Sequence, residues 1–271
     1  MEHLDHVDAS LSYLAESAEK PVYYLHRPPE GTPRRTSQFT KHTLPIHNGR
    51  KLVEKLSLDE EGFTLARRAT ATSDFYDADE VRRVYYPEVE QLVRDETGAV
   101  RVLAFDHNVR CATLAERGEK GVQMPVKSAH NDYTEKSGPQ RVRDLLPAEA
   151  EELLKSRFAV INVWRPISGP VRATPLAVCD ARSIDKRNLV PTDLVYRDRT
   201  GEVYSVTFSP DHRWFYFPDM EADEAMLIKC YDSTHEGRAR FTAHTAFDDP
   251  TTPADAPARE SIEVRTLAFF A

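Results

Sequence analysis

The chain lacks the features that mark several protein classes. Its three cysteines are odd in number and widely spaced, which predicts neither a disulfide framework nor a zinc site. It has no apolar run long enough to cross a bilayer, and its N-terminus lacks the basic start and apolar stretch of a signal peptide. The net charge of −8 disfavours nucleic acid or an anionic membrane surface as a partner. We therefore expect a cytoplasmic protein whose partner is a small molecule, and the sequence predicts no particular oligomeric state.

Helical and strand-like patterns are distributed unevenly along the chain. Helices are expected at residues 8–19, 77–95 and 147–155. The second half reads as strand after strand, and the strand-like segments are 158–167, 175–180, 203–208, 214–217, 224–231 and 261–270, with 203–217 predicted as a hairpin. This pattern favours a mainly β fold with flanking α-helices, a sandwich or barrel rather than alternating β-α units.

No linker divides the chain, so we expect a single domain over residues 1–271. Within it, residues 1–98 are predicted to form a mixed α/β part that packs on a β core of residues 99–271.

A histidine and an aspartate two positions apart, His130 and Asp132, stand out in the chain. In an extended strand such residues project to the same face, so the imidazole and the carboxylate would point into one space. They form two-thirds of the two-histidine, one-carboxylate set that holds non-haem Fe(II) and leaves coordination positions open. The candidates for the second histidine are His212, His235 and His244; we favour His244, and His235 is its main rival.

An arginine and a serine, Arg259 and Ser261, follow His244 after an interval long enough for a loop and a return strand. They alternate onto one strand face. A guanidinium fork takes a carboxylate in two parallel bonds and a hydroxyl adds a third, so the pair suits a dicarboxylate. Arg265 is the alternative anchor. We prefer Arg259 because Ser261 accompanies it, and Glu263 is expected to pair with the arginine that is not used.

Several longer stretches point to a family. Asn-Val-Trp-Arg-Pro-Ile at 162–167, the segment 175–183, Tyr-Asp-Ser at 231–233 and the segment 259–265 are similar to the GA4-desaturase-like, CmcJ–AsaB hydroxylase/desaturase family of Fe(II)/2-oxoglutarate-dependent oxygenases. The resemblance implies a double-stranded β-helix, or jelly-roll, core within residues 99–271. It also implies Fe(II), 2-oxoglutarate and O2 as cofactor and co-substrates, and a small natural-product intermediate as substrate.

The resulting hypothesis gives each candidate residue a role. Metal binding falls to His130, Asp132 and His244, and binding of 2-oxoglutarate falls to Arg259 and Ser261, with Arg265 and Asn162 as further candidates. Candidates for the substrate pocket are Tyr133, Trp164 and Arg165, although Arg165 could equally form a surface salt bridge.

Three functions remain open from the sequence. The first is hydroxylation or desaturation of an unactivated C–H bond with release of succinate and CO2. The second is an Fe(II) oxidase that uses no 2-oxoglutarate, in which Arg259 and Ser261 hold a substrate carboxylate. The third is a non-catalytic jelly-roll binding module.

Overall fold

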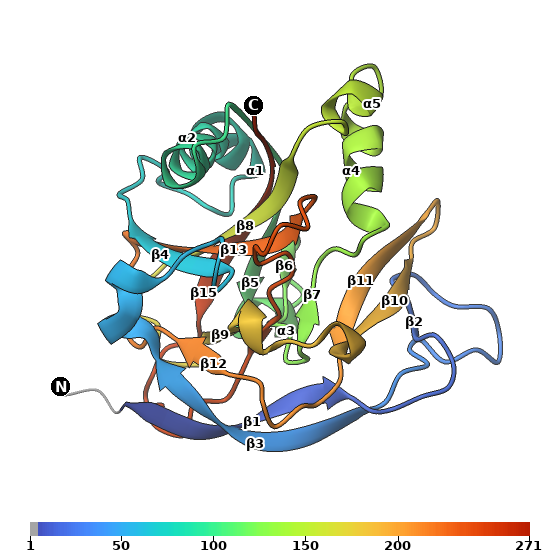
Figure 1. Cartoon of the computed structure of the whole chain (residues 1–271). Coiled ribbons are helices and arrows are strands. Elements are labelled where there is room, and N and C mark those ends of the chain that lie inside the picture. The colour runs from blue at the N-terminus through green and yellow to red at the C-terminus, as the bar shows by residue number, and fades with distance from the viewer. Residues whose placement is uncertain (1–4) are drawn as a thin grey trace.

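The computed structural model describes residues 5–271, and Figure 1 shows the whole chain. Residues 1–4, on which the expectation of no signal peptide largely rests, lie outside the described residues. Strands form most of the ordered structure and a few helices lie against the sheets, which confirms the mainly β class with flanking helices (Figure 1). In the part of the chain that the structure describes, no helix has the length and apolar character needed to cross a membrane.

Two sheets form the body of the protein. Among residues 5–271, the larger sheet has nine strands in the order β1 (His6–Leu14), β3 (Phe39–Asn48), β12 (Trp214–Tyr216), β9 (Leu176–Cys179), β14 (His244–Ala246), β7 (His130–Asn131), β11 (Thr200–Val206), β10 (Leu189–Val195) and β2 (Val22–Tyr24). The smaller sheet has six, in the order β4 (Phe63–Arg67), β13 (Glu224–Asp232), β8 (Phe158–Pro166), β15 (Glu260–Phe269), β5 (Arg101–Cys111) and β6 (Val122–Gln123). Residues 1–98 thus contribute strands to both sheets.

Strand β8 is buried along its whole length because both of its faces are covered. Val160 and Trp164 belong to an apolar cluster between the two sheets, whereas Ile161 and Val163 pack toward the helices on the other side. Those helices are α1 (Ala78–Glu80), the π-helical turn η2 (Val81–Tyr85) and α2 (Tyr86–Thr97), which cover the smaller sheet (Figure 1). Gly98, at φ +70°, ends α2 in the left-handed conformation that glycine favours.

The helix expected at residues 8–19 is wrong, because residues 15–19 form neither helix nor strand and residues 8–14 belong to strand β1. Its buried side chains alternate along the chain: Val7, Ala9, Leu11 and Tyr13. All nine of its residues pair with β3 in antiparallel register. Leu11 and Leu14 are three residues apart, which is the spacing of one face of a helix. The buried side chains of the whole segment instead repeat every two residues, as in a strand.

The hairpin expected over residues 203–217 is also wrong. Strand β11 pairs with β10 and β7, whereas β12 pairs with β3 and β9. The intervening loop therefore crosses between distant parts of the larger sheet. Helix α4 (Ser137–Leu145) was not expected, and α5 (Ala150–Leu153) is shorter than the helix predicted at 147–155. The remaining short helices are η1 (Gly49–Lys55), α3 (Ala112–Glu116), η3 (Ala181–Ser183) and η4 (Lys186–Asn188).

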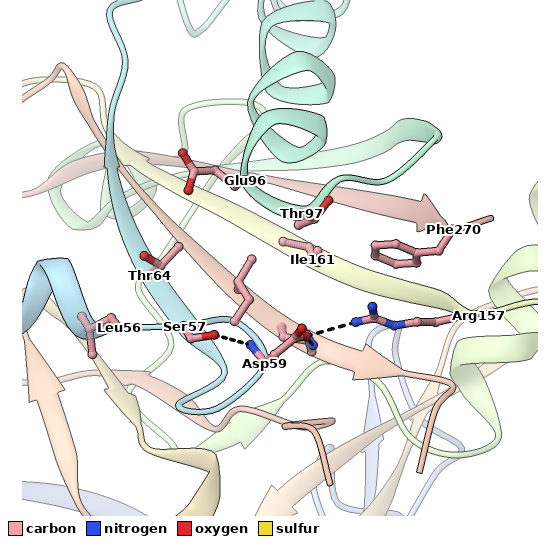
Figure 2. A pocket seen from close by; sticks show the side chains of 11 residues that line it. Leu56, Ser57, Asp59, Thr64, Glu96, Thr97, Arg157, Ile161 and Phe270 are labelled. Atoms are coloured by element: carbon pink, nitrogen blue, oxygen red, sulfur yellow. Dashed lines mark hydrogen bonds and ion pairs between the residues drawn. The ribbon is translucent and has the colours of Figure 1, made fainter. Parts of the chain in front are cut away.

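A cavity of about 180 Å³ lies beside the smaller sheet, and Figure 2 shows its lining. Ile161 lines it from the face of β8 that packs toward the helices. Three charged groups in its wall are paired: Asp59 accepts from Arg157 at 3.1 Å and from Lys229 at 2.6 Å. The smaller sheet therefore separates this cavity from the apolar cluster between the two sheets.

Candidate metal centre

Three predicted residues converge between the sheets. In the register of β7 and β14, His130 lies directly opposite His244, and their ring centroids are 4.5 Å apart. Asp132 follows the end of β7 and places Oδ1 3.5 Å from Nε2 of His130. One potential ligand atom from each residue lies within 4.8 Å of the other two. The rival histidines have other contacts: His212 is bonded to the Tyr13 hydroxyl, and His235 to Arg240.

Backbone carbonyl groups orient both imidazoles. Nδ1 of His130 lies 2.8 Å from the Ser128 carbonyl oxygen, and Nδ1 of His244 lies 3.3 Å from that of Thr242. A carbonyl oxygen can only accept, so each Nδ1 donates and each Nε2 keeps its lone pair for a metal. Burial, followed by the neighbouring His244, lowers the pKa of His130 to about 4. The ring is therefore neutral near pH 7, as a metal ligand must be.

The two oxygens of Asp132 have different surroundings. Oδ2 accepts from Asn162 Nδ2 at 2.8 Å and from Arg265 Nε at 2.8 Å, which leaves Oδ1 toward the imidazoles. Burial would raise the pKa of this carboxyl, but Arg265 and the two histidines hold it well below its usual range. Two imidazoles whose Nδ1 atoms face carbonyl groups, together with one fixed carboxylate, are the donor set of a non-haem Fe(II) site, so the residues fit that metal.

Arg265 is fully engaged with carboxylates. Besides Asp132, it donates to Glu263 at 3.1 Å and to Asp106 at 3.1 Å. It therefore lies against the metal-ligand carboxylate rather than standing free for a co-substrate. Asn162 has the same orienting position, while its own Oδ1 is buried without a partner. Both were predicted as cofactor-binding residues, and the structure places both beside Asp132.

Arg259 and Ser261 are buried with unsatisfied polar atoms. Nη1 of Arg259 donates to the Thr174 carbonyl at 2.7 Å, and the guanidinium lies 5.5 Å from the Trp164 ring centroid. Within residues 5–271, its Nε and the Ser261 hydroxyl have no hydrogen-bond partner. Burial lowers the pKa of Arg259 to about 9, so it is still a cation at neutral pH. Buried unpaired donors beside a cation are the arrangement that a ligand carboxylate would complete.

The predicted pocket residues divide between two faces. Tyr133 and Trp164 are buried in the cluster between the sheets, on the side of the metal ligands. Arg165 lies on the opposite face of β8, 5.3 Å from the Tyr85 ring centroid, and donates to the Arg68 carbonyl oxygen. The structure therefore does not bring Arg165 to the candidate site.

Asn131 is a site residue that sequence reasoning passed over. Its side chain is buried, and Nδ2 donates to the carbonyls of Tyr133 at 2.6 Å and Cys230 at 2.8 Å. Its Oδ1 accepts from the Thr242 amide at 3.2 Å. One amide thus joins the segments that carry His130, Asp132 and His244. Only its place between two ligands could have indicated this role, because two of its three partners, Cys230 and Thr242, lie 99 and 111 residues away along the chain.

Replacing Asn131 by alanine is expected to loosen this junction. Three buried backbone groups lose a partner, at roughly 1–3 kcal/mol for each group left unpaired. Urea unfolding should show the loss in stability, and Co(II) titration should show weaker metal affinity. The matched control is Asn188→Ala, because the Asn188 side chain donates a single long bond of 3.3 Å to Thr207. Equal losses in the two variants would contradict a special role for Asn131.

The fold and the donor set define a metal-dependent oxidoreductase, and comparison with known proteins gives the family. A family model described as "Oxidoreductase/YMDC permease-like domain" matches residues 11–269. The hydroxylase/desaturase efuI of Hormonema carpetanum is 32% identical, over 97% of this chain and 95% of that protein. The Fe(II)/2-oxoglutarate-dependent dioxygenase nvfI of Aspergillus novofumigatus is 33% identical, over 92% and 90% of the two chains.

A solved structure gives the same relationship in three dimensions. The iron and alpha-ketoglutarate-dependent endoperoxidase NvfI superposes with a TM-score of 0.90, over 98% of this chain and 99% of that chain, at 30% identity. The chain therefore belongs to the hydroxylase/desaturase family of Fe(II)/2-oxoglutarate-dependent oxygenases, and the expected jelly-roll core is confirmed. Of the three functions open from the sequence, the relatives favour the 2-oxoglutarate-dependent oxygenase.

Proposed function

We propose that His130, Asp132 and His244 hold Fe(II), and that Arg259 and Ser261 take the far carboxylate of 2-oxoglutarate. The enzyme then hydroxylates or desaturates an unactivated C–H bond of a small natural-product intermediate. The observation that carries the proposal is the convergence of the three donors with both Nδ1 atoms bonded to carbonyls. The unpaired donors of Arg259 and Ser261 support the anchor.

Each residue has a defined task in this reaction. Bound Fe(II) supplies the activation of O2, coupled to conversion of 2-oxoglutarate to succinate and CO2. Asn162 and Arg265 hold Oδ2 of Asp132, so Oδ1 would be the oxygen available to a bound metal. The carbonyls behind His130 and His244 set the imidazole orientation. Buried apolar residues of the inter-sheet cluster, Trp164 among them, keep bulk water away from the reacting groups.

Anaerobic titration tests the proposal directly. Purified protein should bind one equivalent of Fe(II), and addition of 2-oxoglutarate should then produce the visible charge-transfer band of a chelated 2-oxo acid. After oxygen is admitted, the amount of succinate formed should match the amount of 2-oxoglutarate consumed. A slow form of this reaction is expected even when the substrate is absent. Stoichiometric Fe(II) binding without a 2-oxoglutarate band would instead support an Fe(II) oxidase that uses no 2-oxoglutarate. A protein that binds no Fe(II) would support the non-catalytic binding module.

The substrate class and setting are also proposed. The relatives' names cover hydroxylation, desaturation and endoperoxidation, so the same site supports several outcomes and the pocket walls select among them. A small-molecule substrate, and no nucleic-acid or membrane partner, accords with the net charge of −8. Cys111, Cys179 and Cys230 are buried free thiols, which supports work in the reducing cytoplasm.

A further inference from the structure

Arg110 lies beside the candidate anchor in the sheet, on the neighbouring strand. It lies near the end of β5, directly opposite Ser261 in the antiparallel pairing with β15. Side chains directly opposite in such a pair are neighbours on one face, with Cβ atoms about 4.5–5.5 Å apart. Arg259 precedes Ser261 by two residues, so it belongs to the same face if the alternation of the strand continues. Arg110 and Arg259 therefore both occupy positions next to Ser261 in the sheet, one across the strand pair and one along the chain.

Among the described residues, neither guanidinium has a carboxylate partner. Arg110 donates only to neutral acceptors, the Gln123 side chain at 3.2 Å and the Met124 carbonyl at 2.8 Å. Arg259 donates to the Thr174 carbonyl and keeps an unpaired Nε. Among residues 5–271, no acid forms a salt bridge with either of them, and the nearby Glu263 is bonded to Arg265.

Two such cations repel one another unless an anion lies between them. Burial lowers the pKa of both arginines, the charge of Arg110 lowers that of Arg259 further, and Glu263 acts on both in the opposite direction. The unpaired Ser261 hydroxyl provides a further donor at the same place. The described residues thus form a cradle with two positive charges and a hydroxyl, which is the complement of a carboxylate.

We propose that Arg110 is a second cationic anchor for the far carboxylate of 2-oxoglutarate, acting with Arg259 and Ser261 from the adjacent strand. This inference rests on the proposed function, because it takes the Arg259 anchor as its starting point. It adds a residue from a different strand, and it makes the preference for a dicarboxylate depend on both strands.

The test compares 2-oxoglutarate with 2-oxopentanoate, which replaces the far carboxylate by a methyl group. Affinities are measured anaerobically on the Fe(II)-loaded protein by the charge-transfer band. Arg110→Gln should weaken binding of 2-oxoglutarate about 10- to 100-fold and leave binding of 2-oxopentanoate unchanged. The affinity of Arg110→Lys for 2-oxoglutarate should lie between those of the natural protein and Arg110→Gln, because lysine keeps the charge but cannot form two parallel bonds to a carboxylate. The matched control is Arg101→Gln on the same strand, whose exposed side chain pairs with Glu149.

The outcomes separate the two proposals. If Arg259→Gln leaves the preference for 2-oxoglutarate intact, the Arg259 anchor itself is wrong. If Arg259→Gln removes that preference and Arg110→Gln does not, only the second anchor is wrong. Equal weakening of both 2-oxo acids in Arg110→Gln would show that Arg110 merely supports β6 through Gln123 and Met124, and would overturn the inference. If Arg110→Gln does not fold, the same ratio in Arg110→Lys decides.

Discussion

Replacing His244 by alanine is expected to abolish stoichiometric metal binding and, with it, succinate formation. The variant loses one of three donors, and the two that remain lie on a single short segment of the chain, His130 and Asp132. Loss of an outer partner of a metal ligand already costs about 10- to 100-fold in affinity or activity. Loss of the ligand itself should exceed that range. Co(II) titration and a succinate assay measure the two effects separately.

The control for this variant is His235→Ala. His235 was the main rival for the third ligand, and it is exposed and bonded to Arg240. Its replacement should leave both metal affinity and turnover unchanged. His130→Ala should behave like His244→Ala, because the two rings face each other across β7 and β14. Metal affinity retained in His244→Ala, or lost in His235→Ala, would refute the assignment of the centre.

Much of this centre could be predicted from the sequence because its chemistry restricts the residue types. A histidine and an acid two positions apart, a distant histidine and a later arginine-serine pair form an ordered pattern that few other structures require. The long strands β8, β13 and β15 were also predictable, since each is a largely apolar segment that contains β-branched or aromatic residues.

What could not be predicted depends on the register between distant segments. No local pattern shows that Arg110 lies opposite Ser261, since a shift of one residue in β5 would turn it to the helices. The same holds for Arg265, which was considered as an anchor and instead pairs with Asp132. The helix expected at residues 8–19 is wrong for a related reason. The apolar spacing there is compatible with a helix and with a strand, and the pairing with the distant strand β3 makes it a strand.

Replacing Arg265 by methionine should destabilise the metal-free protein by about 3–5 kcal/mol, the cost of removing one partner from a buried ion pair. Methionine has a similar length and fills much of the space. The decrease in the free energy of unfolding therefore reflects the lost positive charge rather than a new cavity. Asp132 would keep only the Asn162 bond on Oδ2, and Glu263 would lose its bond to the guanidinium. Urea unfolding in the presence of a chelator measures this loss.

A divalent cation should return part of that stability, because it supplies the positive charge that Asp132 has lost. Unfolding repeated with saturating Co(II) should therefore show a smaller difference between Arg265→Met and the natural protein than unfolding without metal. Arg101→Met is the control, since its exposed pair with Glu149 should contribute about 0–1 kcal/mol with or without Co(II). If Arg265→Met costs no more than this control, the ion pair does not support the carboxylate. If its cost is large and unaffected by Co(II), the ion pair supports the fold but Asp132 is not a metal ligand.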